Sequence, residues 1–164
     1  GIPDEQLPEY VQRNQLTKHN IIDNISTNPD KHKPILMSEA YPPIPAAGEA
    51  ASAIGALVSI PDVDGGIRME PLLVSYYGDY YPSMALVLAA KGLNLDVDDI
   101  RAILGNSVSL GDRTIRTNAE SLMNTFFYSD NGAGKPAFTV DSFYDVLQGK
   151  IPAGRRGNAP SACR

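Results

Sequence analysis

The chain has 164 residues, a net charge of −5 and 43% hydrophobic residues. This length is enough for one domain, because a chain of about 150 residues buries roughly two thirds of its unfolded surface. The negative charge disfavours a polyanion, so nucleic acid is excluded as a partner. The longest apolar stretch, residues 84–90, is far shorter than the about 20 residues that cross a bilayer. We expect no membrane span or signal peptide within the chain.

The residue types that carry catalysis or bind metals are scarce. Cys163 is the single cysteine, which excludes an intramolecular disulfide and leaves the compartment open. His19 and His32 lack the spacing and the cysteine partners of a zinc site, so we expect solvated histidines. No Gly-x-Ser-x-Gly elbow is present. The sequence therefore offers no catalytic residue, and we predict no metal and no cofactor.

The first third of the chain has weak patterns. A weak helical spacing predicts a helix that begins near Pro8, and two prolines within residues 27–34 predict a surface loop. Small residues at 46–54 predict a helix, and Gly55 is placed to end it in the left-handed conformation.

An acidic turn follows between two apolar segments. Glycine reaches positive φ without a Cβ penalty, so Asp62, Asp64, Gly65 and Gly66 predict a structural turn joining strands at 56–60 and 67–75 in a hairpin. A calcium loop fits poorly, since Gly66 stands where the third ligand belongs. Arg68 has two readings, an ion pair with one of these aspartates or a contact with an anionic signal.

Four tyrosines flank the next turn, at Gly78-Asp79, and cannot all point into one core. Two of them should face the core by alternation, and the others should line a pocket or an interface, which favours the amphipathic phenol ring. Together with Arg68 they are the candidates for ligand or interface contact: Tyr76, Tyr77, Tyr80 and Tyr81.

The following segment predicts a helix at residues 84–90, with Pro82 in its first turn. Its residues are apolar all round, which predicts burial on every side. Asp96 is a suitable N-cap for a further helix at residues 97–104, which Gly105 follows.

The last third predicts a second hairpin, with strands at 108–110 and 114–117. We also predict a buried strand at 122–128 and a final helix that Thr139 caps and Gly149 ends. The glycines at 132–135 lack the remaining residues of a phosphate loop and predict a flexible turn. The predicted class is α/β in the mixed α+β sense, with helices covering a central mixed sheet that contains antiparallel hairpins.

The order of these motifs resembles the second class of CHASE domains, the sensory extracellular modules of bacterial cyclases and histidine kinases. The shared pattern is a small-residue helix, a glycine, Pro-Asp-x-Asp-Gly, a basic residue, Pro-Leu-Leu, a polar turn, Tyr-Pro-Ser and an apolar helix. It is met by residues 44–54, Gly55, residues 61–65, Arg68, and residues 71–73, 78–79, 81–83 and 84–90. Residues 138–140 and 145–152 resemble the closing element of the family.

The resemblance implies a division of the chain. Residues 42–153 form the sensor core and correspond to the C-terminal portion of the family pattern, while residues 1–41 lack a clear counterpart of its N-terminal strand-helix-strand half. Residues 154–164 turn basic where the pattern continues into an apolar strand, which predicts a non-native or disordered tail. A sheet incomplete at its N-terminal side leaves edges open, so we expect a homodimer.

The resemblance also implies a function. It predicts an extracytoplasmic signal-sensing domain on the periplasmic or extracellular face of a bacterial membrane, anchored by segments outside this chain. The signal is an unidentified small molecule or protein, and the output is an adenylate/guanylate cyclase or a kinase of two-component signalling, so this chain is not itself an enzyme. The alternative is a soluble α/β solute-binding domain or an enzyme with an unrecognised site.

Overall fold

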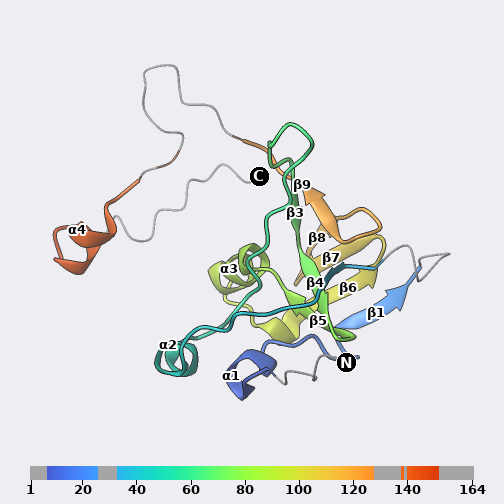
Figure 1. Ribbon diagram of the computed structural model, residues 1–164, viewed down its shortest axis with the longest axis horizontal. Helices are drawn as coiled ribbons and strands as arrows, with labels where there is room; N and C mark the ends of the chain where they lie inside the picture. The colour runs from blue at the N-terminus through green and yellow to red at the C-terminus, as the bar shows by residue number, and fades with distance from the viewer. Residues whose placement is uncertain (1–6, 26–32, 128–137, 139, 152–164) are drawn as a thin grey trace. The chain divides into compact units, whose positions relative to one another are not determined.

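The computed structural model describes residues 7–25, 33–127, 138 and 140–151 (Figure 1). The chain divides into two compact units, Gly1–Thr125 and Phe126–Arg164. Within the described residues the strands form three open sheets that combine parallel and antiparallel pairs. This arrangement confirms the mixed α+β class that the sequence predicted.

The largest sheet has the strand order β1-β6-β7-β8. β1 (Ile21–Asn24) runs parallel to β6 (Ile100–Leu104), which pairs antiparallel with β7 (Ser107–Leu110). β7 and β8 (Arg113–Arg116) form the second predicted hairpin, and Gly111 in its turn has φ +57°. This hairpin is confirmed, because its turn chemistry and its strand pattern are both local.

The other two sheets are smaller. β2 (Ile35–Met37) runs parallel to β4 (Leu73–Tyr76), which pairs antiparallel with β5 (Asp79–Pro82). β3 (Met69–Pro71) pairs antiparallel with β9 (Leu122–Asn124). In Figure 1 the N-terminal strand β1 (blue) lies beside β6, which comes from the middle of the chain. Residues 1–41, which the sequence left unassigned, thus contribute strands to two sheets.

The predicted hairpin around the acidic turn is wrong, although the turn itself forms. Residues 56–60 contain no strand. Ala56 instead donates its backbone N–H to Pro82 O (2.9 Å) and accepts from Met84 N (2.8 Å), so its hydrogen bonds go to the end of β5. The hairpin that does form here is β4–β5, through a two-residue turn in which Tyr77 and Gly78 both have positive φ.

Two short helices precede the acidic turn. α1 (Glu9–Gln12) begins after Pro8, as predicted. α2 (Pro45–Ala50) is shorter than the predicted helix at 46–54, and Gly55 does not end it. A Cβ on Gly55 would lie 2.6 Å from both Cα and N of Met84, so this glycine is needed for a close approach between backbones.

The apolar helix is α3 (Met84–Gly92), and it is capped by Ser83, whose Oγ accepts from Leu86 N (3.2 Å). The prediction that Pro82 lies in the first helical turn is wrong. Pro82 is the last residue of β5 and directly precedes the N-cap residue Ser83. Burial on every side is also wrong. Leu86, Val87 and Ala90 are buried, whereas Leu88 is 64% exposed, so the helix has one buried face.

The helix predicted at residues 97–104 is wrong beyond its first turn. Asp96 and Asp99 form a reciprocal capping box around a single 3₁₀ turn, η1 (Val97–Asp99). The chain then becomes β6, whose residues alternate between buried and half-buried. The segment forms a strand despite its local helical spacing, because it pairs with β1 on one side and with β7 on the other.

The predicted buried strand at 122–128 ends early, since β9 stops at Asn124 and Phe126 and Phe127 are 85% and 78% exposed. In the second unit α4 (Phe143–Leu147) follows the N-cap Ser142. Gly149 after it has φ +69°, as expected for a glycine that ends a helix. Several sequence predictions lie outside the described residues: those for Thr139, His32, Cys163 and residues 27–32, 132–135 and 154–164.

Two hydrophobic clusters lie on opposite faces of β4. The main core contains Leu73 together with side chains of α3, β6 and β7. The second cluster contains Val74, Tyr76 and Tyr81, with half-buried side chains from α1 and β2 against it. Because successive strand residues point to opposite faces, β4 is buried at all four positions and serves both clusters.

Replacement of Gly55 by alanine tests the close approach to α3. Its Cβ would meet backbone atoms that cannot rotate away, so we expect Gly55→Ala to lower the free energy of unfolding by about 1–3 kcal/mol. Gly92→Ala is the matched control, because nothing lies within 4 Å of the added Cβ. We expect it to leave stability unchanged or to raise it by about 0.4–1 kcal/mol. Urea unfolding measures both, and equal stabilities of the two variants would contradict the packing role of Gly55.

Candidate functional site

The acidic turn is closed by backbone and side-chain hydrogen bonds. Asp62 N donates to Gly66 O (2.8 Å), and Gly65 N donates to Asp62 O (2.8 Å), with Gly65 at φ +80°. Asp64 Oδ1 accepts from Gly66 N (3.0 Å). These contacts support the structural role predicted for the four turn residues.

Arg68 lies over this turn and pairs with both of its aspartates. Its Nη1 donates to Asp62 Oδ2 (2.8 Å) and Asp64 Oδ1 (2.7 Å), and its Nη2 donates to Asp64 Oδ2 (2.6 Å). The guanidinium, followed by the Gly66 N–H, lowers the pKa of Asp64 to about 2. With two carboxylates to one guanidinium, the cluster is a poor site for an anionic signal. The geometry favours the first of the two readings of Arg68.

The four tyrosines separate into different environments. Tyr76 and Tyr81 are buried on one face of the β2-β4-β5 sheet, because Tyr81 is the cross-strand partner of Val74 and Tyr76 follows two residues later. Tyr80 is half-buried against the main core on the opposite face. Tyr77 lies in the turn, 46% exposed, with its ring edge-on to that of Tyr76 at 4.7 Å between centroids.

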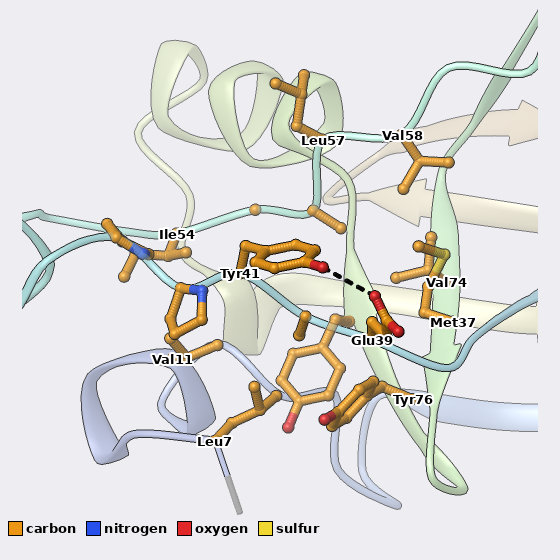
Figure 2. Close-up of a pocket in the computed structure, with 16 residues that line it drawn as sticks. Leu7, Val11, Met37, Glu39, Tyr41, Ile54, Leu57, Val58, Val74 and Tyr76 are labelled. Carbon is orange, nitrogen blue, oxygen red and sulfur yellow. Dashed lines mark hydrogen bonds between the residues drawn. The ribbon is translucent and has the colours of Figure 1, made fainter. Parts of the chain in front are cut away.

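Tyr76 and Tyr81 line a cavity of about 280 Å³. Its walls come from five places: the α1 region (Leu7, Val11), the end of β2 and the residues after it, residues 54–58, β4 and β5. Figure 2 shows Val74 and Tyr76 on the strand side and Leu7 and Val11 on the helix side. Tyr41 and Leu57, which are 90% and 84% exposed, place the mouth at the surface.

The lining is apolar apart from four side chains: Glu39, Tyr41, Tyr76 and Tyr81. Glu39 is the single charged residue among the lining residues that the structure describes. Its Oε2 accepts a hydrogen bond from the Tyr41 hydroxyl (2.8 Å), which Figure 2 shows turned toward the carboxylate. Burial, and then the nearby Asp79 and Tyr76, raise the pKa of the Tyr81 phenol above its usual range. The phenol is therefore neutral at physiological pH.

Hydrogen bonds hold the cavity walls in place. The Tyr10 hydroxyl donates to Pro43 O (2.8 Å), and its ring packs so closely on Gly48 that a Cβ there would lie 2.4 Å away. Asn14 Oδ1 accepts from Ile54 N (3.0 Å), which ties the segment at 54–58 to the end of α1. The residues after β2 and the segment at 54–58 are thus both fastened to α1.

Glu39 and Tyr41 were not predicted from the sequence. One signal could have found them: the apolar run of β2 lies between Pro34 and Ser38, and these two residues follow its end. Because β2 and β4 are parallel, their carboxyl ends meet at one edge of the sheet, where ligands commonly bind in open α/β sheets. That pairing spans too much of the chain to be visible in a local pattern.

Within the described residues there is no group of three or more histidine, cysteine, aspartate or glutamate side chains that could hold a metal. Nor does the described part of the chain contain a helix long and apolar enough to cross a membrane. His19 is exposed, as predicted, with its Nε2 2.8 Å from Arg101 Nη2.

Comparison with known proteins matches the chain to one protein family model. The CHASE2 domain family matches residues 2–160, which is nearly the whole chain. No curated protein and no solved structure matches the chain. The match agrees with the resemblance that the motif order indicated, and it also covers residues 2–41. The division at residues 41 and 153 stays a prediction.

The ion pair at the turn predicts an unusual titration. We expect the Asp64 carboxyl signal in NMR spectra to stay nearly constant from pH 6 to pH 3, because Arg68 holds the pKa at about 2. Arg68→Gln removes the guanidinium, and the same signal should then titrate near the ordinary value of about 3.9. Since the folded-state pKa is depressed, the stabilisation is present above pH 4 and is lost as the pH falls toward 2. Titration near pH 4 in the unmodified chain would contradict the observed geometry.

Proposed function

We propose that this chain, which belongs to the CHASE2 domain family of extracellular sensor domains, controls an adenylate/guanylate cyclase across a bacterial membrane. The observation that carries the proposal is the family match over residues 2–160. Signal sensing follows from the family itself. The cyclase output, the membrane segments outside this chain and the placement on the periplasmic or extracellular face are what the resemblance implies.

The control mechanism is a shift between two conformations of a homodimer. A signal that binds one conformation better than the other moves the equilibrium, and the membrane segments carry that change to the cyclase. The structure supplies surfaces for such a dimer. β1 and β2 are edge strands of their sheets, and they expose Ile22 (60%) and Leu36 (73%). Open edges with exposed apolar side chains favour pairing with a second copy.

The direct test uses the full-length protein that contains this chain. Expression in a bacterial strain without its own nucleotide cyclases should produce cyclic AMP or cyclic GMP in the membrane fraction. We expect Gly55→Ala, which disturbs the sensor domain alone, to change this output at equal protein levels, and Gly92→Ala to leave it unchanged. An output module of another class, or nucleotide production indifferent to both variants, would refute the proposal.

The dimer is tested separately in the isolated chain. We expect light scattering after size exclusion to show a dimer. Leu36→Lys should raise the dissociation constant of this dimer at least severalfold, because pairing at the β2 edge would bury the charge of the lysine. Val63→Lys is the matched control, because Val63 is fully exposed in the acidic turn and belongs to no strand. A chain that is monomeric at high concentration, or equal effects of both variants, would count against an interface at the β2 edge.

A further inference from the structure

We propose that the cavity beside β4 and β5 binds a small organic amine, with its apolar or aromatic body in the cavity and its ammonium group at Glu39. This inference rests on the proposed sensing function and names the class of signal. All the described residues that line this cavity belong to the first unit of the chain.

The apolar body is indicated by the size and lining of the cavity. A volume of about 280 Å³ lies near the lower end of the range of about 300–1,000 Å³ typical of small-molecule sites. The lining includes Val11, Met37, Val58 and Val74, which are buried or half-buried and present hydrocarbon and sulfur to the space. A compact apolar group fits this wall, whereas a sugar or a nucleotide would leave its hydroxyl groups without partners.

The ammonium group is indicated by charge. Glu39 is the one charged side chain among the described lining residues, and no cation of the described part of the chain pairs with it. Tyr41 occupies one of its lone pairs, and a carboxylate can accept several more hydrogen bonds. The aromatic rings of Tyr41, Tyr76 and Tyr81 offer further stabilisation to a cation. Among the described lining residues there is no lysine, arginine or histidine, so no side chain of this set neutralises an acidic ligand.

A second polar contact is indicated by Tyr81. This residue lines the cavity wall and is 8% exposed, and its hydroxyl is open to solvent rather than buried without a partner. A phenol hydroxyl in this position can donate one hydrogen bond and accept another. A polar atom of a ligand, or a water bound beside it, satisfies this group.

The experiment uses three probes of similar size: 2-phenylethylamine, 2-phenylethanol and 3-phenylpropionate. NMR titration of the whole chain measures their dissociation constants, which we expect in roughly the millimolar range for ligands this small. The amine should bind more tightly than the alcohol by about fivefold, the upper value for an exposed ion pair. The carboxylate should bind most weakly, and the shifted signals should belong to residues of the cavity wall.

Variants identify the groups responsible. Glu39→Gln should abolish the preference for the amine over the alcohol, whereas Glu49→Gln makes the same charge change on exposed α2 and should preserve it. Tyr81→Phe should weaken binding of the amine and the alcohol, whereas Tyr80→Phe, on the opposite face of the sheet, should not. Circular dichroism of each variant checks that the fold is retained.

Three results would overturn the inference: no binding of any probe, equal binding of amine and carboxylate, or a preference for the amine that survives Glu39→Gln. None of these would affect the dependence of cyclase output on the domain, which the full-length protein tests independently. Conversely, amine binding by the isolated chain stands even if the output module proves to be a kinase.

Discussion

The structure depends on one strand that is buried on both faces. β4 contributes Leu73 to the main core and Val74 and Tyr76 to the second cluster, so a shift of its register by one residue would exchange the two sets. Its backbone is equally constrained, since β2 pairs on one side and β5 on the other. The main core and the cavity are consequently two faces of the same element. The part of the cavity wall formed by Val74 and Tyr76 therefore belongs to the buried core.

Features fixed by neighbouring residues could be predicted from the sequence, and features fixed by distant partners could not. The glycine turn between β7 and β8, the start of α1 and the apolar helix α3 were all recognised, because cap and turn chemistry act over a few residues. β6 was mistaken for a helix, since Ile100, Ile103 and Leu104 satisfy a helical spacing while Ile100, Ala102 and Leu104 satisfy alternation. The pairing of β6 with β1 and β7 decides between these two patterns.

The same distinction explains what could be predicted of the cavity. Tyr76 and Tyr81 were predicted as candidate contact residues because four tyrosines around one turn cannot all point into one core. Both residues line the cavity. Glu39 and Tyr41 carried only one weak local signal, which is that they follow the short apolar run of β2. They reach the cavity only because β2 joins β4 in parallel, with the residues after its end held to α1 through the Tyr10 hydroxyl. A polar group that depends on such a pairing is invisible until the sheet is assembled.

A sensor needs a binding site that contacts a movable element, because a ligand shifts an equilibrium only by its differential affinity for the two states. The segment at 54–58 links the cavity wall to a second element. It lines the cavity, and at Ala56 it exchanges backbone hydrogen bonds with Pro82 and Met84, which flank the cap of α3. Gly55 brings the two backbones together without a side chain between them. Any displacement of this segment on ligand binding is therefore transmitted to the first turn of α3 through these backbone hydrogen bonds. The partly exposed helix that begins there is the first element along this path that could present the change to a partner.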